Sequence, residues 1–261
     1  MNNKLVEHVQ QVNVKKCIFT IIFRKEDKFM KKFSEAQQSM NQIFLTAMEL
    51  FRENGYENTN IRQLATKADV SLGLVNHYFG SKRNLAYHVL ESLIQYAMLK
   101  TKKYIEDNNI NDELLYDAVA TRVVNVYLSQ GPYRKFYLDS LKEDIFFNYL
   151  ENHSQLLLKK LQKEYDFEVS DDIALLYGHY IPFIVEKTLY LKRNEGLFTS
   201  IPEDDIPFQI FNSTYAGRIP QHILEECDTK ARKFTPIILK TISPIPSIED
   251  LEELDILPLK L

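Results

Sequence analysis

The chain has 261 residues, of which 45% are hydrophobic and 26% charged, and its formal net charge is −4. This length allows one or two domains with a sizeable core, while seven glycines are too few for a fold built on many tight hairpins. Two cysteines provide no disulfide framework, and no apolar run reaches the ~18 residues of a membrane span, so we expect a cytoplasmic protein without a membrane segment. The acidic total excludes a uniformly basic nucleic-acid coat but permits a local basic surface.

The two ends of the chain differ in charge from its middle. Residues 1–33 hold eight lysines and arginines against three acids, whereas residues 243–261 hold one lysine against five acids. Neither end has a helical period of useful length. We therefore expect residues 1–33 to be a basic, disordered extension and residues 241–261 to be an acidic, proline-containing, loosely packed tail.

Between the ends, apolar residues recur with helical spacing, which predicts an all-α fold. Residues 40–54 carry one apolar face, and Gly55 follows where a left-handed cap would end that helix. Pro182 lies inside a later helical pattern and is expected to kink it. The later helices are predicted over residues 81–108, 112–131, 145–166, 170–196, 204–217 and 219–240.

Residues 59–82 predict two short helices, over about 60–67 and 72–78, joined by a turn. The small residue Ala65 lets the two helices approach closely, and Asp69 occupies the turn four positions later. Aspartate tolerates left-handed backbone angles better than most residues. Val75 falls ten positions after Ala65 and closes the corner. This spacing is that of a helix-turn-helix, whose second helix enters the DNA major groove.

The second short helix directs Val75 and Phe79 inward and its other residues outward. An outward Asn76 can pair with adenine, and Arg62 and Lys82 are placed to neutralise phosphates. The predicted DNA-binding residues are Asn60, Arg62, Leu72, Gly73, Leu74, Asn76, His77, Tyr78 and Lys82.

The run FRENGYENTNIRQLATKADVSLGLVNHYFGSKRNLAYHVLE resembles the DNA-binding domain of the tetracycline-repressor (TetR) family, over about residues 40–92. The G-Y, R-x-L-A, V-S-x-G and H-Y-F-G-S-K motifs all lie in register. The resemblance implies a homodimeric, all-helical, ligand-responsive regulator, usually a repressor, whose third helix reads DNA. The sequence departs from the family at Asp69, where glycine is usual, and at Leu72, where a lysine or arginine is common.

We expect residues 34–80 to form the DNA-binding domain and residues 81–240 to form a helical effector-binding and dimerisation domain, with the dimer surface in 171–240. The second of these is dense in aromatic residues, and buried tyrosines with a few charged groups can make a small-molecule pocket. The predicted effector-binding residues are Tyr137, His153, His179, Tyr180, Phe183 and Glu186.

The six histidines and two cysteines show no metal-ligand spacing, and no catalytic constellation is present in the sequence. We therefore expect no metal, no cofactor and no enzymatic activity.

The expected partners are a palindromic double-stranded DNA operator, a second copy of the chain and an unidentified small-molecule effector. Two alternatives stay open: a helical enzyme that carries the DNA module as an appendage, and a scaffold or regulator switched by a partner protein. The basic N-terminal segment before residue 34 is either a minor-groove arm or a disordered leader or mis-started reading frame, in which case residues 1–29 do not belong to the working protein.

Overall fold

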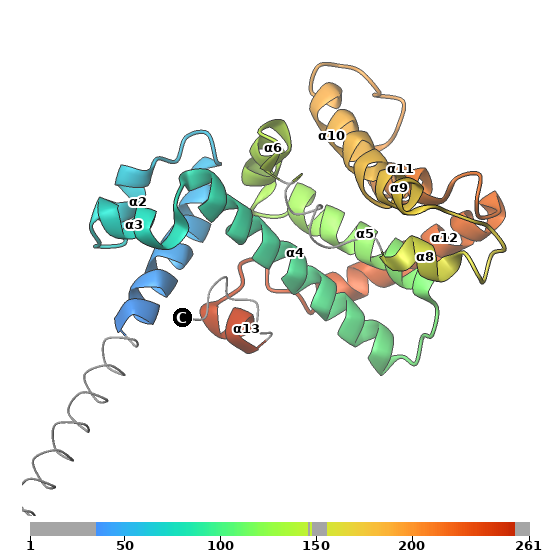
Figure 1. Ribbon diagram of the computed structural model, residues 1–261, viewed down its shortest axis with the longest axis horizontal. Helices are drawn as coiled ribbons and strands as arrows, with labels where there is room; N and C mark the ends of the chain where they lie inside the picture. Colours follow the sequence, from blue (N-terminus) through green and yellow to red (C-terminus); the bar gives the residue numbers. More distant parts are fainter. Residues whose placement is uncertain (1–34, 146, 148–155, 254–261) are drawn as a thin grey trace, which may run out of the picture. The chain divides into compact units, whose positions relative to one another are not determined.

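The structure is a computed structural model that describes residues 35–145, 147 and 156–253. Its described residues fall into two units, one that holds residues 35–42 and a larger one that holds the described residues from 43 onward. The described part is helical and contains no strand, only an isolated bridge between Ala216 and Ile219, so the expected all-α class is confirmed (Figure 1). The expected boundaries after residues 33, 80 and 240 stay predictions.

Three helices come first in the chain. One covers residues 35–54, and it is followed by α2 (Ile61–Lys67) and α3 (Leu72–Phe79). Gly55, with φ +75°, ends the first of them as expected. Within residues 43–79, the hydrophobic residues that are at most 1% exposed are Ile43, Phe44, Ala47, Phe51, Leu64, Val75 and Phe79.

The central element of the larger unit is α5 (Glu113–Gln130), which packs against α4 (Lys82–Asp107) and α12 (Gln221–Leu239) (Figure 1). Both α4 and α5 begin at a side-chain cap. Ser81 Oγ accepts a hydrogen bond from the backbone N–H of Asn84, and Asp112 Oδ1 accepts one from Leu115. The sequence predicted these helices and both of their starting residues.

The helix α6 (Arg134–Lys142) was not predicted from the sequence. It packs against α5 and against α10 (Ile181–Arg193). Its residues Phe136, Tyr137 and Leu141 are fully buried, which explains the apolar spacing that this short segment carries.

Two predicted helices differ from the observed ones. The helix expected over 145–166 has α8 (Leu156–Leu161) as its described core, and residues 162–166 form a turn that ends with Asp166 at φ +52°. The helix expected over 170–196 is composite: α9 (Asp171–Leu175), a π-helical turn η1 (Leu176–Tyr180), and then α10. Pro182 occupies the first turn of α10, where its missing N–H is tolerated, and the π-helical turn precedes it in place of a simple kink.

A buried arginine joins the last helices to α5. Arg122 is 2% exposed, and its guanidinium donates to the carboxylates of Asp204 at 3.0 Å and Asp228 at 2.9 Å. Asp204 belongs to the short 3-10 helix η2 (Glu203–Asp205), which leads into α11 (Ile206–Tyr215), and Asp228 lies on α12. This ion-paired cluster satisfies a charge that would be costly to bury alone.

The chain after residue 240 was expected to be loosely packed, and for residues 242–251 this is wrong. Ile242 and Leu251 are buried, and Leu251 lies on α13 (Ile248–Glu253). The backbone N–H of Ser243 donates to Tyr96 Oη at 3.2 Å, and its carbonyl accepts from Tyr127 Oη at 3.4 Å. These contacts fix the segment to α4 and α5, and the acidic, proline-containing composition did not reveal them.

Gly55 provides a test of how the end of the first helix packs on α6. It has positive φ, and a Cβ on it would lie 2.4 Å from Asp139 Oδ2. Asp139 Oδ2 accepts the backbone N–H of Glu57 at 3.1 Å, and it would have to move. We expect Gly55→Ala to lose about 1–2 kcal/mol through backbone strain and about 1 kcal/mol more through this displacement, and we expect the second loss to be absent in an Asp139→Ala background. Equal losses with and without Asp139→Ala in urea unfolding would contradict this packing.

Candidate functional site

The helix α3 has a buried side and an open side. Val75 and Phe79 are each 1% exposed, while Leu72 is 41% exposed. Gly73, Asn76 and His77 are also exposed, and Leu74 and Tyr78 are partly exposed. The orientation inferred from spacing is therefore the observed one, and the residues expected to read DNA are on the open side.

Local capping holds α3 in this orientation. Ser71 Oγ accepts the backbone N–H of Leu74 at 3.2 Å, and Gly80 ends the helix with φ +70°. Asp69 has φ +52°, so the turn residue takes the left-handed conformation expected for the position. Ala65 is 5% exposed at the contact between α2 and α3. The helix α3 is thus positioned by short-range interactions that the sequence motif encodes.

Asn60 and Arg62 lie at the start of α2. The side chain of Asn60 caps α2, with Oδ1 accepting from the backbone N–H of Gln63 at 2.9 Å, and Gln63 returns a bond to the N–H of Asn60. Arg62 is exposed, and it lines a shallow surface depression with Asn60, Thr66 and Lys67. Asn60 is therefore a structural cap whose amide Nδ2 is the donor that can meet a phosphate.

Lys82 is more enclosed than its predicted role required. Its Nζ donates to the backbone carbonyls of Tyr56 and Thr59, each at 2.9 Å, and lies 4.0 Å from the centroid of the Tyr56 ring. Burial lowers the pKa of Lys82, although nearby carboxylates oppose that effect. Lys82 therefore ties the segment after the first helix to the first turn of α4, and two of its three N–H donors are used there.

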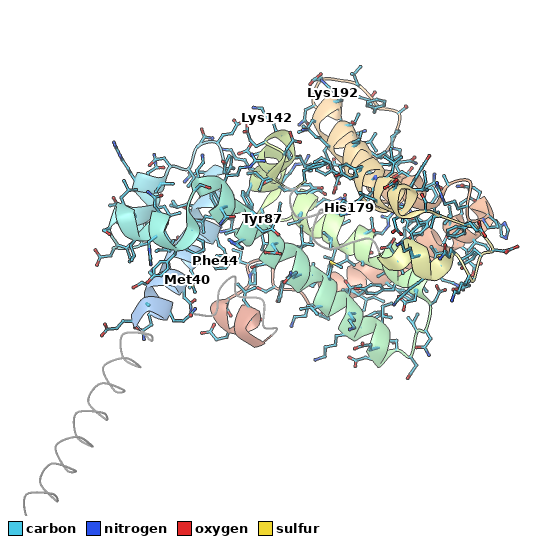
Figure 2. The ribbon with its side chains drawn as sticks, viewed as in Figure 1. Met40, Phe44, Tyr87, Lys142, His179 and Lys192 are labelled. Carbon is cyan, nitrogen blue, oxygen red and sulfur yellow. The ribbon has the colours of Figure 1, made fainter. Side chains whose placement is uncertain are left out.

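A cavity of about 400 Å³ lies among α4, α5, α8, the π-helical turn, α10 and α11. Of the predicted effector-binding residues, His179, Phe183 and Glu186 line it (His179 is labelled in Figure 2). Tyr137 and Tyr180 are not part of the lining, but the hydroxyl of Tyr137 donates a hydrogen bond to Glu186, which is. His153 lies outside the described residues.

Glu186 is a buried carboxyl in the wall of this cavity. It is 6% exposed, and its Oε1 accepts bonds from Asn125 Nδ2 at 2.6 Å and from the hydroxyl of Tyr137. Burial raises the pKa of Glu186 to about 7, while the two hydrogen bonds act in the opposite direction. Near neutral pH this group can therefore gain or lose a proton.

Asp117 is a second carboxyl in the wall, and sequence reasoning missed it. Its Oδ2 accepts a hydrogen bond from the hydroxyl of Tyr215 at 2.9 Å, and burial raises the pKa of Asp117 to about 6. The available signal was on α5, where Asp117 and Asn125 are eight residues apart and so project from nearby sides of the helix. Near the cavity's edge, Lys160 Nζ lies 3.3 Å from the carboxylate of Glu113.

The helix α6 connects the cavity wall with the helix-turn-helix. Tyr137 bonds Glu186, and the neighbouring Phe136 stacks on Phe51 with ring centroids 4.8 Å apart. At the end of α6, the guanidinium of Arg83 donates to the carbonyls of Glu143 at 2.7 Å and Asp144 at 3.0 Å. A shift of α6 would thus act on the first helix and on the start of α4 together (Lys142, at the end of α6, is labelled in Figure 2).

Among the described residues, no group of three or more histidine, cysteine, aspartate or glutamate side chains could hold a metal ion. In the same residues, every helix is too short or too polar to cross a membrane.

Comparison with known proteins points to one family. Residues 43–89 match the family described as bacterial regulatory proteins, tetR family. The chain is 22% identical over 194 residues to the "Probable HTH-type transcriptional regulator YttP" of Bacillus subtilis (strain 168), covering 65% of this chain and 91% of that protein. It is 34% identical over 70 residues to the HTH-type transcriptional regulator HbdR of Aromatoleum sp. (strain CIB), covering 27% of this chain and 31% of that protein. A solved structure of a gamma-butyrolactone receptor (ArpA like protein) aligns with a TM-score of 0.47 at 18% identity, covering 77% of this chain and 98% of that one.

The enclosed position of Lys82 predicts a loss of stability when its charge is removed. Lys82→Met leaves the Tyr56 and Thr59 carbonyls without their donor, so we expect the free energy of unfolding to fall by about 1–3 kcal/mol. Lys67→Met is the matched control, because Lys67 makes only exposed ion pairs with Glu49 and Glu53, whose loss should change stability little. Equal, small losses in both variants would show that Lys82 has no such structural role.

The raised pKa of Glu186 predicts that stability depends on pH. Because the folded state holds this proton up to about pH 7, whereas an ordinary glutamate releases it near 4.5, the free energy of unfolding should fall as pH rises between those values. Glu186→Gln should remove on the order of 2 kcal/mol of the fall between pH 5 and 7.5. Chemical unfolding at both pH values measures this, with the exposed Glu168→Gln as control. A pH profile unchanged by Glu186→Gln would contradict the assignment.

Proposed function

We propose that this chain is a DNA-binding transcriptional regulator of the TetR type, and specifically a cytoplasmic repressor which a small-molecule effector releases from a palindromic operator. The observation that carries the proposal is the open side of α3, where Asn76 and His77 are exposed next to a fully buried Val75. An α-helix presenting such a side has the size of the major groove of DNA.

DNA recognition is divided between base and phosphate contacts. The amide of Asn76 pairs with an adenine edge, Leu72 meets a thymine methyl group, and Tyr78 bonds to the backbone. Arg62, exposed on α2, supplies a phosphate contact, and the enclosed Lys82 contributes mainly by holding the domain together. Because this surface carries few lysine and arginine side chains, tight binding to DNA depends on two protomers acting together.

The homodimer uses the last helices of the larger unit. Exposed apolar residues lie on the π-helical turn (Leu176, 40% exposed), on α10 (Ile184, 52%) and on α12 (Ile237, 47%). Apolar residues on neighbouring helices support a four-helix interface between two copies, within the stretch 171–240. Such a dimer places two copies of α3 about 34 Å apart, which is one turn of DNA.

Release from DNA follows from the contacts of α6. A ligand in the cavity meets Glu186, which holds Tyr137 of α6, and Phe136 of the same helix stacks on Phe51. A ligand that prefers one position of α6 therefore also prefers one position of the helix-turn-helix and of α4. When that position spaces the two copies of α3 wrongly, operator affinity falls. The cavity favours this mechanism over switching by a partner protein alone, and we propose no enzymatic step.

Selection of bound fragments from a random double-stranded DNA library tests the proposal. The full chain should enrich a palindrome whose half-sites are separated by about one helical turn or a multiple of it. Asn76→Ala should relax the preference at one position of each half-site, which is a loss of about 1–3 kcal/mol of discrimination. Arg62→Ala should weaken all sites alike and reduce the salt dependence.

Two results would overturn the proposal. The first is a selection that enriches no sequence. The second is an Asn76→Ala variant that enriches the wild-type palindrome with unchanged base preference at every position, because α3 would then not read the DNA.

A further inference from the structure

We propose that the cavity takes an organic cation: an apolar or aromatic molecule that carries a protonated amine, held by the carboxyl groups of Asp117 and Glu186. This inference rests on the proposed function only in treating the cavity as the effector site. It goes further by stating which chemical class of ligand the wall selects.

The charges in the cavity wall are unbalanced. The described lining contains three acidic side chains, Glu113, Asp117 and Glu186, against one lysine, Lys160, and one histidine, His179. Lys160 forms its ion pair with Glu113, and both of these residues are exposed. Within the described residues, no lysine or arginine is ion-paired with Asp117 or Glu186, whose hydrogen bonds come from the neutral groups of Tyr215, Asn125 and Tyr137.

The two carboxyls occupy separate places along the cavity. Asp117 lies on α5, and Glu186 is bonded to Asn125, eight residues later on the same helix. Eight residues of α-helix span about 12 Å, so the two acids do not share one proton, and each can receive its own ligand group. Because both bonds to Glu186 from Asn125 and Tyr137 end on Oε1, the Oε2 atom is the one that we assign to the ligand.

The wall also carries a set of apolar side chains that fits the hydrophobic body of such a ligand. Side chains from four helices contribute to it: Ile94, Met98, Val124, Phe183, Ile210 and Phe211. At about 400 Å³, the cavity has the size of ordinary small-molecule sites. An apolar body would therefore be enclosed while its amine meets one of the acids.

Electrostatics separates the ligand classes. In a cavity of low dielectric constant, an ionised carboxylate without a counter-ion is costly, and an incoming ammonium group removes that cost by pairing with it. A carboxylate ligand of the same shape is repelled by the carboxylates of Asp117 and Glu186. A neutral ligand of that shape gains apolar contact without relieving either acid. Binding should therefore follow the order cation, neutral molecule, anion.

Three probes with one aromatic body test this order: 1-naphthylmethylamine, 1-naphthylmethanol and 1-naphthoate. Calorimetric titration of the full chain at pH 7.5, without DNA, measures their affinities. We expect the amine to bind at least tenfold more tightly than the alcohol and the anion not to bind. Because the single amine meets one acid, at least one of the variants Glu186→Gln and Asp117→Asn should weaken the amine about tenfold or more, and both should leave the alcohol within about twofold. Glu168→Gln, an exposed acid outside the cavity, is the matched control and should change nothing.

The outcomes separate this inference from the proposed function. Equal affinity for amine and alcohol, amine affinity unchanged in both cavity variants, or no binding of any probe would overturn the ligand class. Release of the selected operator by the amine is measured separately. Amine binding that depends on the two carboxyls but leaves operator affinity unchanged would contradict effector release while the ligand class stands.

Discussion

The larger unit depends on the burial of one carboxyl group, that of Glu186. A carboxyl removed from water needs hydrogen-bond donors, and here they come from Asn125 on α5 and Tyr137 on α6, while Glu186 itself lies on α10. Three helices are therefore fixed to one another at this group. Phe136 is the residue next to Tyr137 on α6, and its ring stacks on that of Phe51. The position of the helix-turn-helix therefore depends on the same carboxyl group. The hydrogen bonds that Glu186 needs thus help to position the surface that would meet DNA.

The helix-turn-helix itself is held by short-range contacts that leave it little internal freedom. Ser71 and Asn60 cap its two short helices, and Lys82 joins the backbone before α2 to the first turn of α4. A surface fixed in this way is expected to move as one body. Under the proposed function, regulation acts on where this surface lies relative to the same surface of a second copy, and the contacts of α6 and of Arg83 are the means by which the remainder of the protein could displace it.

The sequence predicted what is encoded by neighbours in the chain and missed what is encoded by distant partners. The turn at Asp69 and the buried Val75 followed from spacing within about twenty residues. Asp117 was missed because its partner, Tyr215, is 98 positions away. The packed segment around Ser243 was missed for the same reason, since it is held by Tyr96 and Tyr127. The apolar pattern of α6 is too short to predict a helix by itself. Its packing on α5 and α10, which the sequence does not reveal, is what stabilises the helix.

The number of residues in the π-helical turn at Leu176–Tyr180 determines which side chains of α10 face the cavity. Such a turn accommodates one more residue than an α-helical turn, and everything after it is rotated by about 100° relative to an unbroken helix. In the register that results, Phe183 and Glu186 face the cavity and Ile184 is exposed. Deleting a single residue from this stretch would restore a regular helix and exchange the acid in the wall for a neighbouring side chain. Insertions and deletions, and not only substitutions, are therefore a route by which the selectivity of this cavity can evolve.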